Sequence, residues 1–147
     1  MEIARLLARH SRVALDTCVF IYQMERNPRY FEVANKVFEW MERPGSSAIT
    51  STVALTEILV QPYRTANLHQ AEDFYALLTS MPNLDWVAPS LQIANSAASL
   101  RASYRLRTPD ALIAATAISC QASAFITNDP VFRRVAEFDA LILDDYV

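Results

Sequence analysis

Four carboxylates stand at positions from which they could share one metal ion. Asp16 and Asp129 each follow a short apolar run, Glu57 lies within a predicted helix, and Asp110 begins another. Two carboxylates about 4 Å apart repel by roughly 4 kcal/mol at an effective dielectric of 20. If the four meet, they therefore hold protons or bind a cation, and Mg²⁺ prefers carboxylate oxygens and water. Such a site can orient a water for attack on phosphorus.

Each acid also has a simpler structural explanation. Asp129 precedes Pro130 and could be an N-cap, and Asp16 could cap its own helix in the same way. Asp110 could simply complement a helix dipole. Glu57 shares a helix face with Val53, four residues before it, and Val60, three residues after it, so it points toward apolar neighbours, although a position at the solvent edge is also open.

The pattern of apolar residues predicts that strands alternate with helices. Short, continuously apolar strands are typical of a parallel sheet covered on both faces. Ligands bind beyond the carboxyl ends of such strands, where the four acids would meet. Ser51 or Thr52, and Ser90, are predicted helix caps. The predicted strands are 13–15, 47–50, 84–88, 124–127 and 140–143; the predicted helices are 17–26, 29–43, 52–61 (stopped by Pro62), 66–80, 91–107, 108–120 and 130–135; 1–12 is expected to be an edge segment or loose turn.

Length and composition predict one domain, residues 1–147, with a real core. The chain has 147 residues and is 52% hydrophobic. Gly45 is the only glycine, which excludes both common glycine-rich phosphate loops. Cys18 and Cys120 are predicted to be buried free thiols, and no segment resembles a signal peptide or membrane span. We therefore expect a soluble, cytoplasmic protein. The net charge of −3 gives no general attraction to nucleic acid, although Lys36 is the only lysine among 13 basic residues.

Four stretches of the sequence together resemble the motifs of the PIN domain. The third stretch is the most specific of them, and the resemblance extends from Val13 to Leu143. More narrowly, the chain resembles the VapC-type toxins of toxin–antitoxin pairs. The stretches are Leu15-Asp16-Thr17-Cys18-Val19-Phe20-Ile21, Thr56-Glu57-Ile58-Leu59, Arg107-Thr108-Pro109-Asp110-Ala111-Leu112-Ile113-Ala114-Ala115-Thr116-Ala117 and Ile126-Thr127-Asn128-Asp129-Pro130-Val131-Phe132.

The resemblance implies a single PIN-like α/β domain: a five-stranded parallel sheet with helices on both faces. It implies a Mg²⁺- or Mn²⁺-dependent endoribonuclease, a cognate antitoxin bound near helices 17–26 and 29–43, and commonly a homodimer. The implied metal ligands and catalytic residues are Asp16, Glu57, Asp110 and Asp129, with Thr17 and Thr127 as supporting hydroxyls. Many relatives carry Asn where this chain has Cys18, which puts one hydrogen bond near the metal in question.

The arginines suggest a path for RNA beside the acids. Arg101 and Arg105 are predicted to share a helix face with Arg107 close by, and Arg133 and Arg134 follow the fourth acid. They could contact RNA phosphates, or form a solvated face or a surface that contacts the antitoxin.

Three other functions are consistent with part of the pattern. A receiver domain would need a second acid near its amino end and a lysine late in the chain, and the only lysine here is Lys36. A catalytically inactive PIN-like scaffold that binds RNA or protein would have no reason to keep four acids. A structure-specific DNA nuclease would need insertions that clamp DNA.

Overall fold

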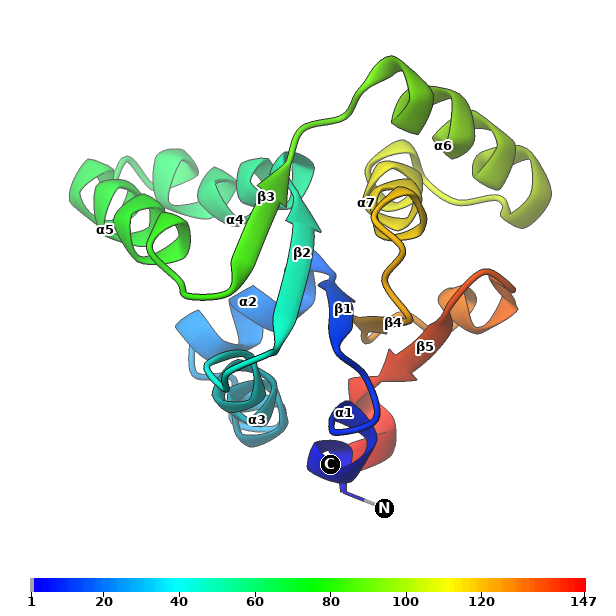
Figure 1. Cartoon of the computed structure of the whole chain (residues 1–147). Coiled ribbons are helices and arrows are strands. Elements are labelled where there is room, and N and C mark those ends of the chain that lie inside the picture. The colour runs from blue at the N-terminus through cyan, green and yellow to red at the C-terminus, as the bar shows by residue number, and fades with distance from the viewer. Residues whose placement is uncertain (1) are drawn as a thin grey trace.

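The computed structural model describes residues 2–147 and has the α/β architecture that the sequence predicts (Figure 1). Five strands alternate with helices along the chain. The elements are α1 (Ile3–Leu7), β1 (Arg12–Leu15), α2 (Thr17–Met24), α3 (Phe31–Met41), β2 (Ser47–Ser51), α4 (Thr52–Arg64), α5 (Leu68–Thr79), β3 (Leu84–Val87), α6 (Leu91–Tyr104), α7 (Thr108–Ser119), β4 (Ala124–Thr127), the 3₁₀ helix η1 (Pro130–Arg134), β5 (Asp139–Ile142) and the 3₁₀ helix η2 (Leu143–Tyr146).

All strand pairings in the sheet are parallel, and the order is β3-β2-β1-β4-β5. β1 is the central strand, and Leu15 at its end pairs with Ile126 of β4. The backbone N–H of Asp16 extends this ladder by donating to the carbonyl of Ile126 at 2.9 Å. This register sets Asp16 beside Thr127, so the first and fourth motifs meet at the carboxyl edge.

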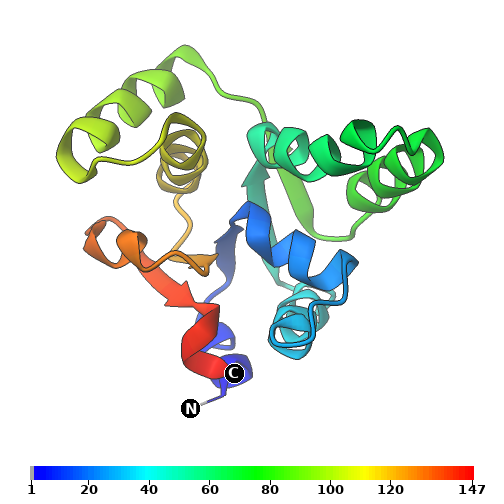
Figure 2. The same cartoon turned by 180° about the vertical axis from the view of Figure 1, so that it is seen from behind.

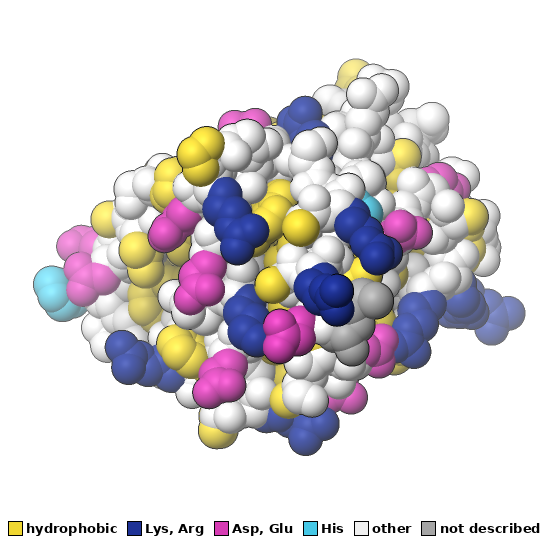
Figure 3. All heavy atoms as spheres, turned by 60° about the horizontal axis from the view of Figure 1, so that its bottom comes forward, with side chains coloured by type: hydrophobic (Ala, Val, Ile, Leu, Met, Phe, Trp, Pro, Cys, Tyr) yellow, Lys and Arg dark blue, Asp and Glu magenta, His cyan; other side chains and the backbone are white. Residues whose placement is uncertain are grey.

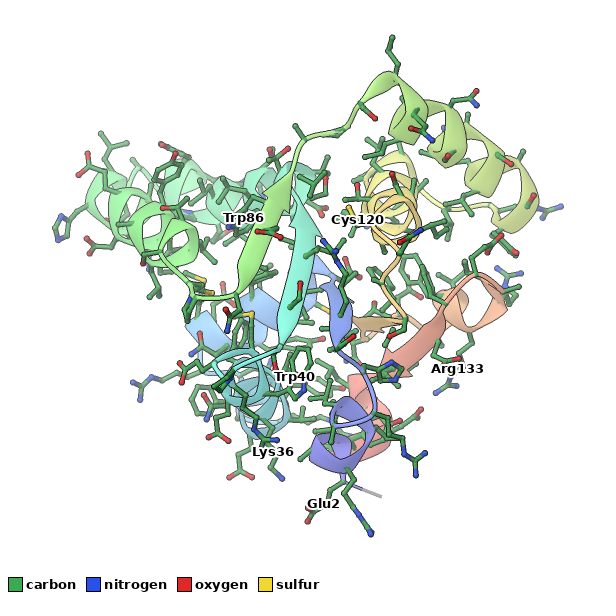
Figure 4. The ribbon with its side chains drawn as sticks, viewed as in Figure 1. Glu2, Lys36, Trp40, Trp86, Cys120 and Arg133 are labelled. Atoms are coloured by element: carbon green, nitrogen blue, oxygen red, sulfur yellow. The ribbon has the colours of Figure 1, made fainter. Side chains whose placement is uncertain are left out.

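Helices cover both faces of the sheet, and each face has its own core. Residues of α1, α2 and α3 pack on one face, together with η2 and part of α5. Residues of α6, α7 and η1 pack on the other. Figure 2 shows α2 in the foreground, beginning at the end of β1. Trp40 lies between α3 and the centre of the molecule (Figure 4), where it is 4% exposed.

The first segment differs from the prediction. The part of 1–12 that the structure describes contains helix α1 rather than a loose turn. Ile3 and Leu7 are one helical turn apart, and both are buried in the core that α2 and α3 also form. Tertiary burial therefore stabilises a helix that is too short to be stable on its own.

Two helix ends also differ from the prediction. α4 continues through Pro62 to Arg64, because a proline near the end of a helix removes a single hydrogen bond and here its ring is buried. α6 stops at Tyr104, and Arg105 adopts a left-handed conformation with φ of 56°. Arg105 therefore does not share a helix face with Arg101. No helix among residues 2–147 combines the length and apolarity that crossing a membrane requires.

Candidate active site

Asp16 occupies the junction between the central strand and α2. It is the N-cap of α2, and its Oδ1 accepts a hydrogen bond from the backbone N–H of Thr17 at 2.8 Å. Its Oδ2 accepts from the hydroxyl of Thr127 at 2.7 Å. Asp16 is only 7% exposed. The carboxylate thus caps the helix and remains a fixed acceptor at the sheet edge, so the structural and functional roles are compatible.

Glu57 turns toward Asp16 rather than into free solvent. The hydroxyl of Thr17 donates to Oε1 of Glu57 at 2.7 Å. The side chain projects from α4, which Ser51 caps by accepting from the N–H of Val53. This bond joins the first and second motifs across 40 residues, while the supporting role of Thr17 stays a prediction.

Thr127 connects the first acid to the fourth. Its hydroxyl donates to Asp16 and also accepts from the backbone N–H of Asp129 at 3.1 Å. Asp129 is the N-cap of η1, and its Oδ1 accepts from the N–H of Val131 at 3.0 Å. Asp129 is exposed, so its second oxygen can still bind a ligand.

Asp110 lies in the first turn of α7 and has a cationic partner. The Nε–H of Arg107 donates to its Oδ2 at 3.0 Å. The Asp110 side chain is 14% exposed, and the Arg107 side chain is 76% exposed. Its bond to Asp110 raises the pKa of the Arg107 guanidinium, and the charges of Glu57 and Asp129 raise it further.

All four predicted acids line one open cavity of about 430 Å³. Thr17 and Arg107 line it too, whereas Thr127 lies behind Asp16. Cys18, which the resemblance placed near the metal, lines the cavity as well, and so do four residues that the sequence analysis did not assign to the site: Ile21, Tyr22, Asn128 and Pro130. Helical periodicity could have identified those on α2, because residues 17, 18, 21 and 22 share one helix face.

Asn128 and Cys18 complete the wall near α2. The Nδ2 of Asn128 donates to the hydroxyl of Tyr22 at 3.0 Å, and its Oδ1 accepts from the N–H of Asp144 at 2.9 Å. Both cysteines are free, as predicted, but each is partly rather than completely buried. Burial, and then the charge of Asp16, raise the pKa of the Cys18 thiol, which keeps it protonated.

The acids influence one another electrostatically. Burial raises the pKa of Asp16 from 3.8 to about 6, against the hydrogen bonds from Thr127 and Thr17, which lower it. The charges of Asp110 and Glu57 raise it further. A buried carboxylate facing two like charges is the arrangement that a bound cation would relieve.

The donor set suits a hard divalent cation, although it is not preassembled. Carboxylate oxygens from four segments are the ligands that Mg²⁺ or Mn²⁺ would use. As the side chains are placed, however, no three Asp, Glu, His or Cys residues within 2–147 lie close enough to share an ion. Arg107 holds Asp110 and Thr17 holds Glu57, so binding an ion requires a change of side-chain conformation rather than of fold.

The other arginines have separate positions. Arg101 uses its Nε–H to cap the carbonyl of Leu106 at 2.9 Å, and Arg105 does not line the cavity. Arg133 forms an ion pair with Asp145 and projects outward beside β5 in Figure 4. The Nη2 group of Arg134 donates a hydrogen bond to the backbone carbonyl of Tyr104 at 3.4 Å. None of these four arginines forms a hydrogen bond or ion pair with an acid of the cavity, whereas Arg107 does.

A comparison of the sequence with models of known protein families assigns this chain to one of them. The family model described as PIN domain matches residues 13–138, a span that includes all four acids. The chain belongs to the PIN domain family. Nuclease activity is general in this family. A search of curated protein sequences finds no match.

Solved structures with similar folds support the PIN architecture. VapBC2 from Rickettsia felis, bound to a promoter DNA fragment, aligns with a TM-score of 0.70 at 18% identity, covering 89% of this chain and 98% of that chain. A toxin–antitoxin complex from Klebsiella pneumoniae gives 0.68 at 22%, with 89% and 97% covered. VapBC-1 from nontypeable Haemophilus influenzae gives 0.69 at 22%, with 90% and 98% covered. At these identities the likeness establishes the fold.

Proposed function

We propose that this PIN domain is a Mg²⁺- or Mn²⁺-dependent endoribonuclease, the VapC-type toxin of a toxin–antitoxin pair. The observation that carries the proposal is the convergence of Asp16, Glu57, Asp110 and Asp129 on one cavity at the carboxyl edge of the sheet. These acids come from four segments separated by up to 113 residues, from 16 to 129. Helix capping accounts for Asp16 and Asp129 individually but not for their meeting with Glu57 and Asp110.

Each residue then has a defined task. Asp16 and Asp110 would be direct ligands, and Asp129 and Glu57 would bind directly or through water. A bound divalent ion would activate a water for in-line attack on an RNA phosphodiester and stabilise the leaving oxygen. Thr127 orients Asp16, and Thr17 orients Glu57, through the two hydrogen bonds of 2.7 Å. The chain's own contribution is thus to anchor Asp16 and Glu57 beside the cavity, where a change of side-chain conformation would bring them to a shared ion.

RNA cleavage by an Asp16→Asn variant tests the proposal. The variant keeps the side-chain volume but loses the charge of a proposed direct ligand, so we expect Mg²⁺- or Mn²⁺-dependent cleavage to fall by at least about 100-fold while the circular dichroism spectrum is unchanged. Asp85→Asn is the matched control, because Asp85 is an exposed residue of β3 outside the cavity. Cleavage by Asp16→Asn equal to that of the control would refute the assignment. A substrate panel of RNA and DNA separates the ribonuclease from a DNA nuclease.

A catalytically inactive PIN-like scaffold is the second candidate. It is favoured by one observation: no three ligands lie ready to share an ion among the described residues. Isothermal titration with Mg²⁺ and Mn²⁺ distinguishes the two functions. Binding at millimolar concentration or below supports the nuclease, and no binding supports the scaffold.

We propose that this chain binds a cognate antitoxin protein and also forms a homodimer. Large apolar side chains are exposed on the neighbouring helices α4 and α5, including Tyr63 at 59% and Leu68 at 62%. A second cavity of about 240 Å³ lies among α2, α3 and the end of α5. An amphipathic segment is the kind of partner that such a surface accepts. A small neighbouring reading frame with a DNA-binding amino end would support this partner.

The charges outside the cavity give less guidance about RNA. Figure 3 shows Lys and Arg interspersed with Asp and Glu on the face that it presents. With a net charge of −3, this arrangement offers no broad basic surface on that face. At the cavity itself, Arg107 is the arginine that lines the wall together with the acids.

A further inference from the structure

Arg107 is a positive charge placed directly among the proposed metal ligands. Its Nε–H binds Asp110 at 3.0 Å, and it lines the cavity with all four acids. Glu57 and Asp129 also act on its charge. Arg107 therefore partly neutralises the same carboxylates that a divalent ion would neutralise.

We propose that Arg107 exchanges partners during the reaction cycle. It pairs with Asp110 while the divalent ion is absent, and it is released to contact an RNA phosphate next to the scissile bond when the ion binds. The inference rests on the proposed function, because it needs both an ion and an RNA substrate at this site. It assigns Arg107 as a residue that links metal loading to substrate binding.

The geometry favours such an exchange. Arg107 is the N-cap residue of α7 with an extended backbone, whereas Asp110 is fixed one turn inside the helix. The pair has a single Nε–H bond, and the Arg107 side chain is 76% exposed. Because the Arg107 end of the pair is open to solvent and only one hydrogen bond holds it, a divalent ion can displace the guanidinium from Asp110.

The position of Arg107 after release suits a phosphate. The side chain lines the cavity, and among residues 2–147 Asp110 is the only acid with which it forms an ion pair. The planar guanidinium can form paired hydrogen bonds with phosphate oxygens. Among the arginines predicted to contact RNA, Arg101 is engaged with the carbonyl of Leu106 and Arg105 lies outside the cavity, so neither is equivalent to Arg107.

Metal affinity tests the first half of the exchange. Removing a competitor for Asp110 should make Arg107→Ala bind Mn²⁺ about two- to fivefold more tightly than wild type, measured by calorimetry without RNA. Arg105→Asn is the matched control: it removes a nearby positive charge, and asparagine tolerates the left-handed backbone at this position. In wild type, the NMR signal of the Arg107 Nε–H should shift when diamagnetic Mg²⁺ is added.

The salt dependence of RNA binding tests the second half. We would use a single-stranded RNA with Ca²⁺ as the hard cation, and compare this with chelator. With Ca²⁺, Arg107→Ala should reduce the slope of log K against log salt by about 0.7, the loss of one phosphate contact. With chelator the slope should match that of wild type, because Arg107 is then paired with Asp110.

The outcomes separate this inference from the proposed function. If wild type binds no divalent ion at millimolar concentration, the proposed function fails, and the exchange fails with it. If wild type binds the ion but Arg107→Ala has the affinity of Arg105→Asn and the Nε–H signal does not move, only the exchange is refuted. An unchanged salt slope with Ca²⁺ would likewise overturn the phosphate contact alone.

Discussion

Replacing Asp16 with asparagine should stabilise the metal-free protein at neutral and alkaline pH, although it abolishes cleavage. The pKa of Asp16 is raised from 3.8 to about 6 by burial and, more weakly, by the charges of Asp110 and Glu57. Because the folded state binds this proton more tightly than the unfolded state, the group destabilises the fold as pH rises. The loss begins near pH 3.8 and is complete above about pH 6.

The shift sets the size of the expected effect. Ionising Asp16 costs about 3 kcal/mol of folding free energy at pH 8 and about 1 kcal/mol at pH 4.5. Asparagine avoids this cost but cannot accept from the Thr127 hydroxyl as the carboxylate does, a loss of about 1 kcal/mol at either pH. We therefore expect Asp16→Asn to be about 2 kcal/mol more stable than wild type at pH 8, and about equal to it at pH 4.5.

Urea unfolding in EDTA at the two pH values measures both differences. Asp85→Asn removes only an exposed ion pair with Arg12 at 3.9 Å, so it should change stability by less than about 1 kcal/mol, and by the same amount at both pH values. Adding Mg²⁺ should stabilise wild type through linkage but not Asp16→Asn. If the difference between Asp16→Asn and wild type is the same at pH 4.5 and pH 8, Asp16 does not ionise at a cost, and the reasoning about the buried acid is wrong.

Two further substitutions probe the support of the site. Thr127→Val removes the donor to Asp16 and the acceptor of the Asp129 N–H, so it should raise the pKa of Asp16 above 6 and destabilise the fold by about 1–3 kcal/mol. Urea midpoints across a pH series would show stability still falling beyond pH 6, whereas a profile like that of wild type would contradict this. Phe20→Ala should lower the free energy of unfolding by about 3–5 kcal/mol. The Phe20 ring is fully buried, and its centroid lies 5.6 Å from the ring centroids of both Phe38 and Trp86. A loss below 1 kcal/mol in the same assay would show that the core collapses around the gap.

The local pattern of the chain was sufficient to predict the sheet and most of its helices. Short apolar runs such as 124–127 are strands because only burial on both faces accommodates them. Ser51 and Ser90 cap their helices as predicted, since a hydroxyl next to a helix start accepts an N–H whatever the rest of the fold. Helix α1 and the continuation of α4 past Pro62 could not be predicted this way, because packing overrides weak local preference.

The meeting of the four acids was predictable from the sequence, but neither the other residues that line the cavity nor its geometry was. The positions of Asp16, Glu57, Asp110 and Asp129 relative to strands and helices placed them at one edge. That Glu57 accepts from Thr17, and that Thr127 bridges Asp16 and Asp129, depends on side-chain directions that packing fixes.

The sequence by itself therefore determined the strand–helix alternation, the carboxyl edge and the four acids that this edge collects. Only the tertiary structure decided which partner each acid has, including the Arg107–Asp110 pair and the separation of Arg105 from Arg101. The physical reason is the distance along the sequence over which each interaction acts. Apolar periodicity and capping are set by neighbours within a turn or a strand, whereas hydrogen bonds such as that between Thr17 and Glu57 join residues that only the folded sheet brings together.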